Sequence, residues 1–150
     1  MSSEGSSTIF RNCPAGLDRK RIRAFQRQLS MEVASGAPFS CLLARDKVLT
    51  GLNLQFLGRD YPADVLSFPS AAGSASLGEI AISVDRAAEQ GAQFGHSTEE
   101  EIEILMLHGV LHLIGMDHES DRGRMARAEA KWRATFGLPG ALIERSRRRR

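Results

Sequence analysis

Residues 108–118 read HGVLHLIGMDH and contain three of the four histidines of this 150-residue chain. His108 and His112 are four residues apart, so on a helix their side chains lie on one face, one turn apart. Gly115 follows, and glycine readily takes the left-handed conformation that ends a helix and reverses the chain. Such a reversal would bring His118 toward the other two imidazoles. The spacing predicts a metal site with three histidine ligands and an open fourth position, as in catalytic zinc centres.

The same histidine spacing occurs in the metzincin proteases, whose motif is H-E-x-x-H-x-x-G-x-x-H. In the protease motif, the glutamate after the first histidine is the general base. Here that position is Gly109, which can neither accept nor deliver a proton. The stretch therefore predicts the metal ligands of a metalloprotease without its base, and this argues against peptide hydrolysis.

The helix that would carry His108 and His112 has a clear beginning. Ser97 is followed three residues later by Glu100, which is the pattern of a capping box. The apolar residues that follow cover most of the helix circumference, and such a helix is usually buried. We therefore expect a rigid central helix that holds two of the metal ligands.

The remaining elements are predicted from hydrophobic periodicity and from turn residues. Strands are expected within residues 8–12, 39–44, 61–69 and 77–84, and helices within 17–35, 46–57, 85–94 and 121–136, with Asp46 capping the second helix. This order predicts an α+β domain with one mixed β-sheet. The order of the strands does not follow from the sequence.

Composition indicates an ordinary soluble globular protein, with 42% hydrophobic and 25% charged residues. No window approaches 18 consecutive apolar residues, and the first seven residues lack the apolar segment of a secretory signal. The two cysteines, Cys13 and Cys41, are far apart and are expected to pack as reduced thiols. These features predict a cytoplasmic protein.

Basic charge is concentrated at the C-terminal end. Residues 144–150 contain five arginines and one glutamate, and without them the net charge changes from +2 to −2. We therefore expect one hydrolase domain over residues 1–143 and an arginine-rich tail over 144–150. Such a tail either binds nucleic acid through phosphates or is a solvated end without a fixed partner.

The pattern H-G-x-L-H-x-x-G-x-D-H resembles the signature of the YbeY family, the bacterial rRNA maturation factors described as zinc-dependent endoribonucleases. The resemblance covers most of residues 48–132 and includes Leu52-Asn53, the DYPADVLSFP segment at 60–69, LGEI at 77–80, and Met125 with Glu129. It implies a small mixed β-sheet with helices packed around a central metal-bearing helix, in a zincin-like arrangement. It implies a single-strand-specific endoribonuclease acting in ribosomal RNA maturation and ribosome quality control. It also implies one Zn²⁺ per chain, held by His108, His112 and His118, and contacts with the ribosomal small subunit or assembly factors.

Two positions depart from the family pattern. An arginine tied to activity usually follows the aromatic residue that is Phe56 here, but this chain has Leu57 at that position. Arg59, two residues later, is the candidate catalytic substitute, although it could equally be a surface residue before a turn. The family threonine is replaced by Ala63. The nucleophile, either water activated by the metal or the RNA 2′-hydroxyl, is left open.

Two further side chains lie near the ligand stretch. Asp117 either orients a ligand imidazole or caps the turn. His96 is expected to be a surface residue rather than a fourth ligand. Two rival functions remain: a metalloprotease, which Gly109 opposes, and a non-catalytic ribosome-assembly factor in which the metal only holds the fold.

Overall fold

The computed structural model describes residues 5–117 and 121–139. Its elements are β1 (Ser7–Phe10), α1 (Arg19–Glu32), β2 (Ser40–Ala44), α2 (Asp46–Leu57), β3 (Val65–Pro69), β4 (Gly78–Ser83), α3 (Val84–Phe94), α4 (Thr98–Leu113) and α5 (Arg124–Phe136). The predicted order of strands and helices along the chain is confirmed, and so is the mixed α+β class.

The four strands form one mixed sheet in the order β1-β2-β4-β3. β1, β2 and β4 run parallel, whereas β3 pairs with β4 in the antiparallel direction. Pro62 and Pro69 lie on either side of the core of this segment, and proline favours the edge of a sheet because it cannot donate to an inner ladder. β3 is indeed an edge strand, and β1 forms the opposite edge.

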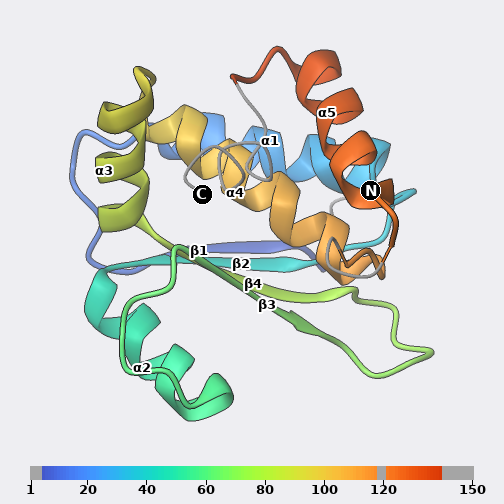
Figure 1. Ribbon diagram of the computed structural model, residues 1–150, viewed down its shortest axis with the longest axis horizontal. Coiled ribbons are helices and arrows are strands. Elements are labelled where there is room, and N and C mark those ends of the chain that lie inside the picture. The colour runs from blue at the N-terminus through green and yellow to red at the C-terminus, as the bar shows by residue number, and fades with distance from the viewer. Residues whose placement is uncertain (1–4, 118–120, 140–150) are drawn as a thin grey trace.

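Helices cover both faces of this sheet (Figure 1). Because side chains alternate along a strand, Ile80 and Ile82 face the main core, whereas Ala81 faces a smaller cluster beneath α2. α1, α3, α4 and α5 lie on the main-core side, with α4 in the middle. Every residue of α4 from Glu101 to Leu111 is buried. The prediction of a buried central helix is therefore confirmed.

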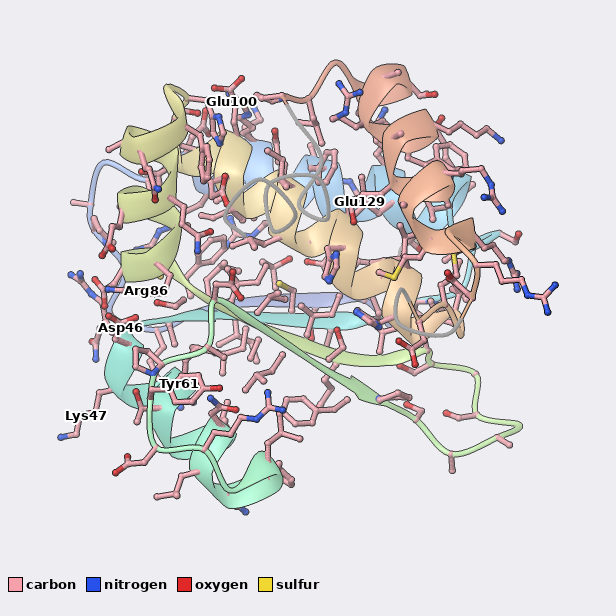
Figure 2. All side chains as sticks on the ribbon, in the orientation of Figure 1. Asp46, Lys47, Tyr61, Arg86, Glu100 and Glu129 are labelled. Atoms are coloured by element: carbon pink, nitrogen blue, oxygen red, sulfur yellow. The ribbon has the colours of Figure 1, made fainter. Side chains whose placement is uncertain are left out.

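The start of α2 differs from the prediction that Asp46 caps it. The N-cap residue is Arg45, whose side chain makes no capping bond. Instead, the Asp85 carboxylate accepts a 2.8 Å hydrogen bond from the Asp46 backbone N–H, while Ser83, the N-cap of α3, donates a 2.6 Å bond to the Asp46 carboxylate. The two helix starts therefore stabilise each other, and Arg86 adds an ion pair to Asp46 at 3.4 Å (Figure 2).

The capping box of α4 is present as predicted, since Ser97 accepts from the backbone of Glu100 and the Glu100 side chain accepts from the backbone of Ser97.

α5 begins three residues later than predicted. Arg122 and Gly123 have φ values of 58° and 84°, which are incompatible with a right-handed helix. The Asp121 carboxylate accepts from the backbone N–H groups of Gly123 and Met125, and so helps to start the helix.

Both cysteines pack as predicted. Cys41 is buried in the main core and Cys13 lies against it. Burial raises the pKa of each thiol, most strongly for Cys41, so the thiolate form is disfavoured. Across the described part of the chain, no helix combines the length and apolar character needed to cross a membrane.

Candidate metal centre

His108 and His112 meet on one side of α4. Their Nε2 atoms are 3.2 Å apart, and the rings pack edge to face with centroids 4.8 Å apart. Two nitrogen ligands at zinc–nitrogen distances of 2.0–2.1 Å in a tetrahedral site lie about 3.3 Å from each other. The two imidazoles therefore already have the separation that two ligands of one metal ion require.

Glu129 on α5 sets the orientation of His108. Its Oε2 lies 2.9 Å from His108 Nδ1, and the carboxylate points from α5 toward α4 (Figure 2). An ionised carboxylate can only accept a hydrogen bond, so this contact places the proton on Nδ1. The lone pair of Nε2 then faces His112, which is the tautomer that a metal-binding histidine needs. Since Glu129 is only 1% exposed, water competes little for this carboxylate.

Gly109 lets α4 approach the sheet closely. A Cβ atom at this position would lie 3.0–3.2 Å from three side-chain atoms of Ile80 on β4. On the adjacent edge strand, the Ser67 hydroxyl donates a 3.2 Å bond to the Gly109 carbonyl. The residue after the first histidine therefore faces the packed sheet, so the position that carries the base in the protease motif has no room for one.

His118, the third predicted ligand, lies outside the described residues, so its position stays a prediction. The chain does turn after α4 as predicted: Gly115 has φ +98°, and its N–H bonds to the His112 carbonyl. Asp117 follows on the surface. Within residues 5–117 and 121–139, no three potential ligand side chains come together, and His108 with His112 form the described part of the site.

The prediction for His96 is wrong in one respect. Its side chain is only 5% exposed, and Nε2 lies 2.6 Å from Glu101 Oε1 at the beginning of α4. Glu101 precedes His108 by two turns, roughly 10 Å along the helix axis. His96 is thus a buried side chain that contacts Glu101 rather than a surface residue.

Arg59 follows the C-terminal end of α2, on the face of the sheet opposite α4, and its side chain is exposed. Asn53 anchors the segment: its carbonyl accepts from the Arg59 N–H at 3.3 Å, and its side chain donates to the Tyr61 carbonyl at 2.9 Å. The next element is edge strand β3, which contacts α4 through Ser67.

Glu129 is the site residue that sequence reasoning did not identify as functional, because its partner is 21 residues away on another helix. A local signal exists nonetheless. Met125 and Glu129 are four residues apart on the buried face of α5. A carboxylate on such a face needs a partner, since burying an unpaired charge is costly.

Comparison with known proteins identifies related chains. Residues 16–137 match the family model described as Endoribonuclease YbeY. A protein named Endoribonuclease YbeY from Solibacter usitatus (strain Ellin6076) is 58% identical over 96% of this chain and 97% of its own. A protein of the same name from Koribacter versatilis (strain Ellin345) is 40% identical over 92% of this chain and 90% of its own.

A solved structure has a similar fold. The solution structure of TM1509 from Thermotoga maritima aligns with a TM-score of 0.58 at 26% identity, and the alignment covers 83% of this chain and 85% of that one. The mixed sheet and its helices are therefore found in an experimentally determined structure as well.

Proposed function

The chain belongs to the YbeY family of endoribonucleases, and we propose that it cleaves single-stranded RNA with one zinc ion held by His108, His112 and His118. Family membership makes it an RNA-cleaving hydrolase. The observation that carries the zinc site is the 3.2 Å separation of the His108 and His112 Nε2 atoms, with the His108 tautomer fixed by Glu129.

The donor set fits zinc well, because neutral imidazole nitrogens are among its preferred ligands and Glu129 supplies the carboxylate partner of a zinc-bound histidine. When bound, the metal would activate water or polarise a phosphoryl oxygen. The protein's contribution is to keep the two imidazoles rigid on a buried helix. His108 is 8% exposed, whereas His112 is half-buried.

Arg59 is our proposed electrostatic residue. A guanidinium group can form two parallel hydrogen bonds to a phosphate and stabilise the charge that grows on it during cleavage. Support comes from its anchored segment beside edge strand β3, which also contacts α4 through Ser67. Leu57, at the usual family position of the arginine, cannot supply this charge.

The biological setting belongs to the same proposal. We place the enzyme in the cytoplasm, acting in ribosomal RNA maturation and ribosome quality control alongside the ribosomal small subunit or assembly factors. We assign residues 1–143 to one hydrolase domain, zincin-like in the placement of its metal helix. The tail at 144–150, outside the described residues, would add affinity for RNA through its five arginines.

A paired assay tests the proposed activity. One zinc-loaded preparation is offered a fluorophore-labelled single-stranded RNA and, separately, a quenched peptide library. We expect RNA cleavage without peptide cleavage, because the position of a protease base is occupied by Gly109. Peptide cleavage with intact RNA would reverse the assignment.

A non-catalytic assembly factor is the remaining alternative, and the replacement of the family arginine by Leu57 is the observation that favours it. That role predicts RNA affinity indifferent to metal and no cleavage at any zinc concentration. RNA cleavage that disappears with chelation and returns with added zinc would exclude it.

A further inference from the structure

α1 divides its basic residues between two faces. Arg21 pairs with Glu103 on α4 through two bonds of 2.9 Å. Arg19, Arg23 and Arg27 lie on the opposite face of the helix and are exposed. They are spaced by four residues, so they form a row with about 6 Å between neighbours along the helix axis. We call these three residues the arginine stripe.

The stripe lies beside β1, an edge strand of the sheet. The guanidinium carbons of Arg19 and Arg23 are 5.1 Å and 5.0 Å from the centroid of the Phe10 ring. Attraction between a cation and the face of an aromatic ring favours these positions. Two of the three guanidinium groups are therefore held beside β1 instead of extending freely into solvent.

A cleft of about 240 Å³ opens between the stripe and the start of β1, and it is lined by Ser6, Thr8, Arg23, Gln26 and Arg27. Gln26 is buried and donates to the carbonyls of Ser7 and Phe39 at 3.0 Å and 2.8 Å, so it is a fixed part of the wall. The cleft is smaller than the roughly 300–1,000 Å³ typical of drug-sized ligands, and the guanidinium groups of Arg23 and Arg27 in its wall can bind phosphate oxygens.

The polar groups in this cleft favour an anion. Ser6 Oγ accepts a 3.2 Å bond from the Phe39 N–H, which leaves its own hydroxyl proton to donate. Arg23 and Arg27 bring two positive charges, and among the described residues that line the cleft none carries a carboxylate. Like charges four residues apart repel one another on a helix, and this repulsion offsets part of the attraction to the Phe10 ring.

We propose that the arginine stripe and its cleft bind successive phosphates of a single-stranded RNA segment. This inference rests on the proposed function, which makes RNA the substrate. A linear row of cations matches a linear row of phosphates, whereas a free phosphate ion would use the cleft alone. Because the stripe faces away from α4, the bound segment is remote from the histidine pair. The stripe therefore contributes affinity for long RNA and not the chemical step.

The test compares two full-length double variants in their zinc-loaded form. Arg23→Gln/Arg27→Gln removes two charges from the cleft, and Lys47→Gln/Lys131→Gln removes two exposed charges on α2 and α5, away from the stripe. Affinity for a 12-nucleotide single-stranded RNA is measured by fluorescence anisotropy across a salt series. A single-stranded DNA of the same sequence serves as an uncleavable probe of the same phosphate contacts.

We expect the plot of log affinity against log salt to become shallower by about 1.4 for the arginine variant, since each phosphate contact on a single strand contributes about 0.7. The lysine control should keep the wild-type slope, and so should Arg23→Lys/Arg27→Lys, which retains the charge and guards against a folding defect. An unchanged slope in the arginine variant, or an equal loss in the lysine control, would overturn the proposal.

The same experiment separates this inference from the proposed function. Cleavage of a four-nucleotide RNA at saturation should be equal in wild type and in the arginine variant. If the wild type cleaves no RNA, the proposed function fails, yet the salt slopes on the DNA probe still decide whether the stripe binds phosphates. If cleavage falls with an unchanged slope, the stripe acts in the chemical step and the inference is wrong.

Discussion

The hydrogen bond between His108 and Glu129 controls which nitrogen of His108 is available for a metal. A carboxylate on Nδ1 raises the basicity of the imidazole and restricts its rotation, and loss of such a partner typically costs 10–100-fold in metal affinity. We therefore expect Glu129→Ala to bind zinc about 10–100-fold more weakly. Glu129→Gln should lose less, because its amide oxygen still accepts from Nδ1.

Competition with a chromophoric chelator measures these affinities, with Glu32→Gln on the exposed end of α1 as the control. Equal zinc affinity in wild type and Glu129→Ala would show that the contact has no role in metal binding.

The contact between Gly109 and Ile80 gives a second prediction for a single residue. Alanine usually stabilises a helix interior over glycine by about 1 kcal/mol. Here the added Cβ would lie 3.0 Å from Ile80 Cδ1, and overpacking a core typically costs about 1–3 kcal/mol. Ile80 is 1% exposed and cannot turn away easily. We expect Gly109→Ala to lower the free energy of unfolding by about 1 kcal/mol.

Urea denaturation measures this change, and α2 offers a matched control. Gly51 is also helical and has open space at its Cβ position, so Gly51→Ala should stabilise the fold by up to about 1 kcal/mol. Stabilisation by both substitutions would contradict the packing explanation.

The sequence alone showed that Gly109 cannot serve as the general base of a protease. The reason why glycine stands at this position depends on its contact with Ile80, on a strand nearly 30 residues away in the chain.

At the level of elements, α2 and α3 are joined by the reciprocal bonds between Asp46, Ser83 and Asp85. The hydrogen bond from the Asp46 backbone N–H, helped by Arg45, holds the pKa of Asp85 below its usual value. Asparagine at this position keeps an oxygen that can accept from the Asp46 N–H, but it removes the charge that pairs with Arg45, and such an exposed ion pair contributes up to about 1 kcal/mol. We expect Asp85→Asn to lower the free energy of unfolding at pH 7 by about this amount, whereas Asp60→Asn, at an exposed position, should change it little.

The pH dependence of this loss has a defined sign. The pKa of Asp85 is lower in the folded state than in the unfolded state, so its ionisation stabilises the fold above the unfolded value of about 4. This contribution is lost as the pH falls through the folded pKa. Urea denaturation of both proteins from pH 7 downward should show the gap closing below about pH 4. A gap that widens there would contradict this assignment.

The element order was predictable because each helix or strand has a local signal, such as the capping box at Ser97 or the alternation from Ile80. The strand order was not, since placing β4 between β2 and β3 depends on contacts between distant segments. The prediction that Asp46 caps α2 was wrong for the same reason. The carboxylate that accepts a hydrogen bond from the start of α2 is Asp85, which belongs to α3. His96 likewise resembled a surface residue until its contact with Glu101 was known.

For the whole molecule, a metal bound by His108, His112 and His118 would link α4 to the turn that leads into α5. Binding to the folded state alone stabilises it by about 4 kcal/mol when the free metal concentration is a thousand times the dissociation constant. Removal of zinc with a chelator should therefore lower the melting temperature, followed by circular dichroism. An identical melting curve for protein shown to be zinc-free would count against a metal site coupled to the fold.

Zinc-titrated RNA cleavage tests the central claim most directly. Metal-free wild type and the His108→Ala/His112→Ala variant receive increasing zinc, and the cleavage rate of a labelled single-stranded RNA is recorded at each addition. We predict that the wild-type rate rises until one zinc ion per chain is bound and then stays constant, while the variant shows no rise. A rate independent of zinc in the wild type, or an equal rise in the variant, would contradict a metal-dependent endoribonuclease built on this histidine pair.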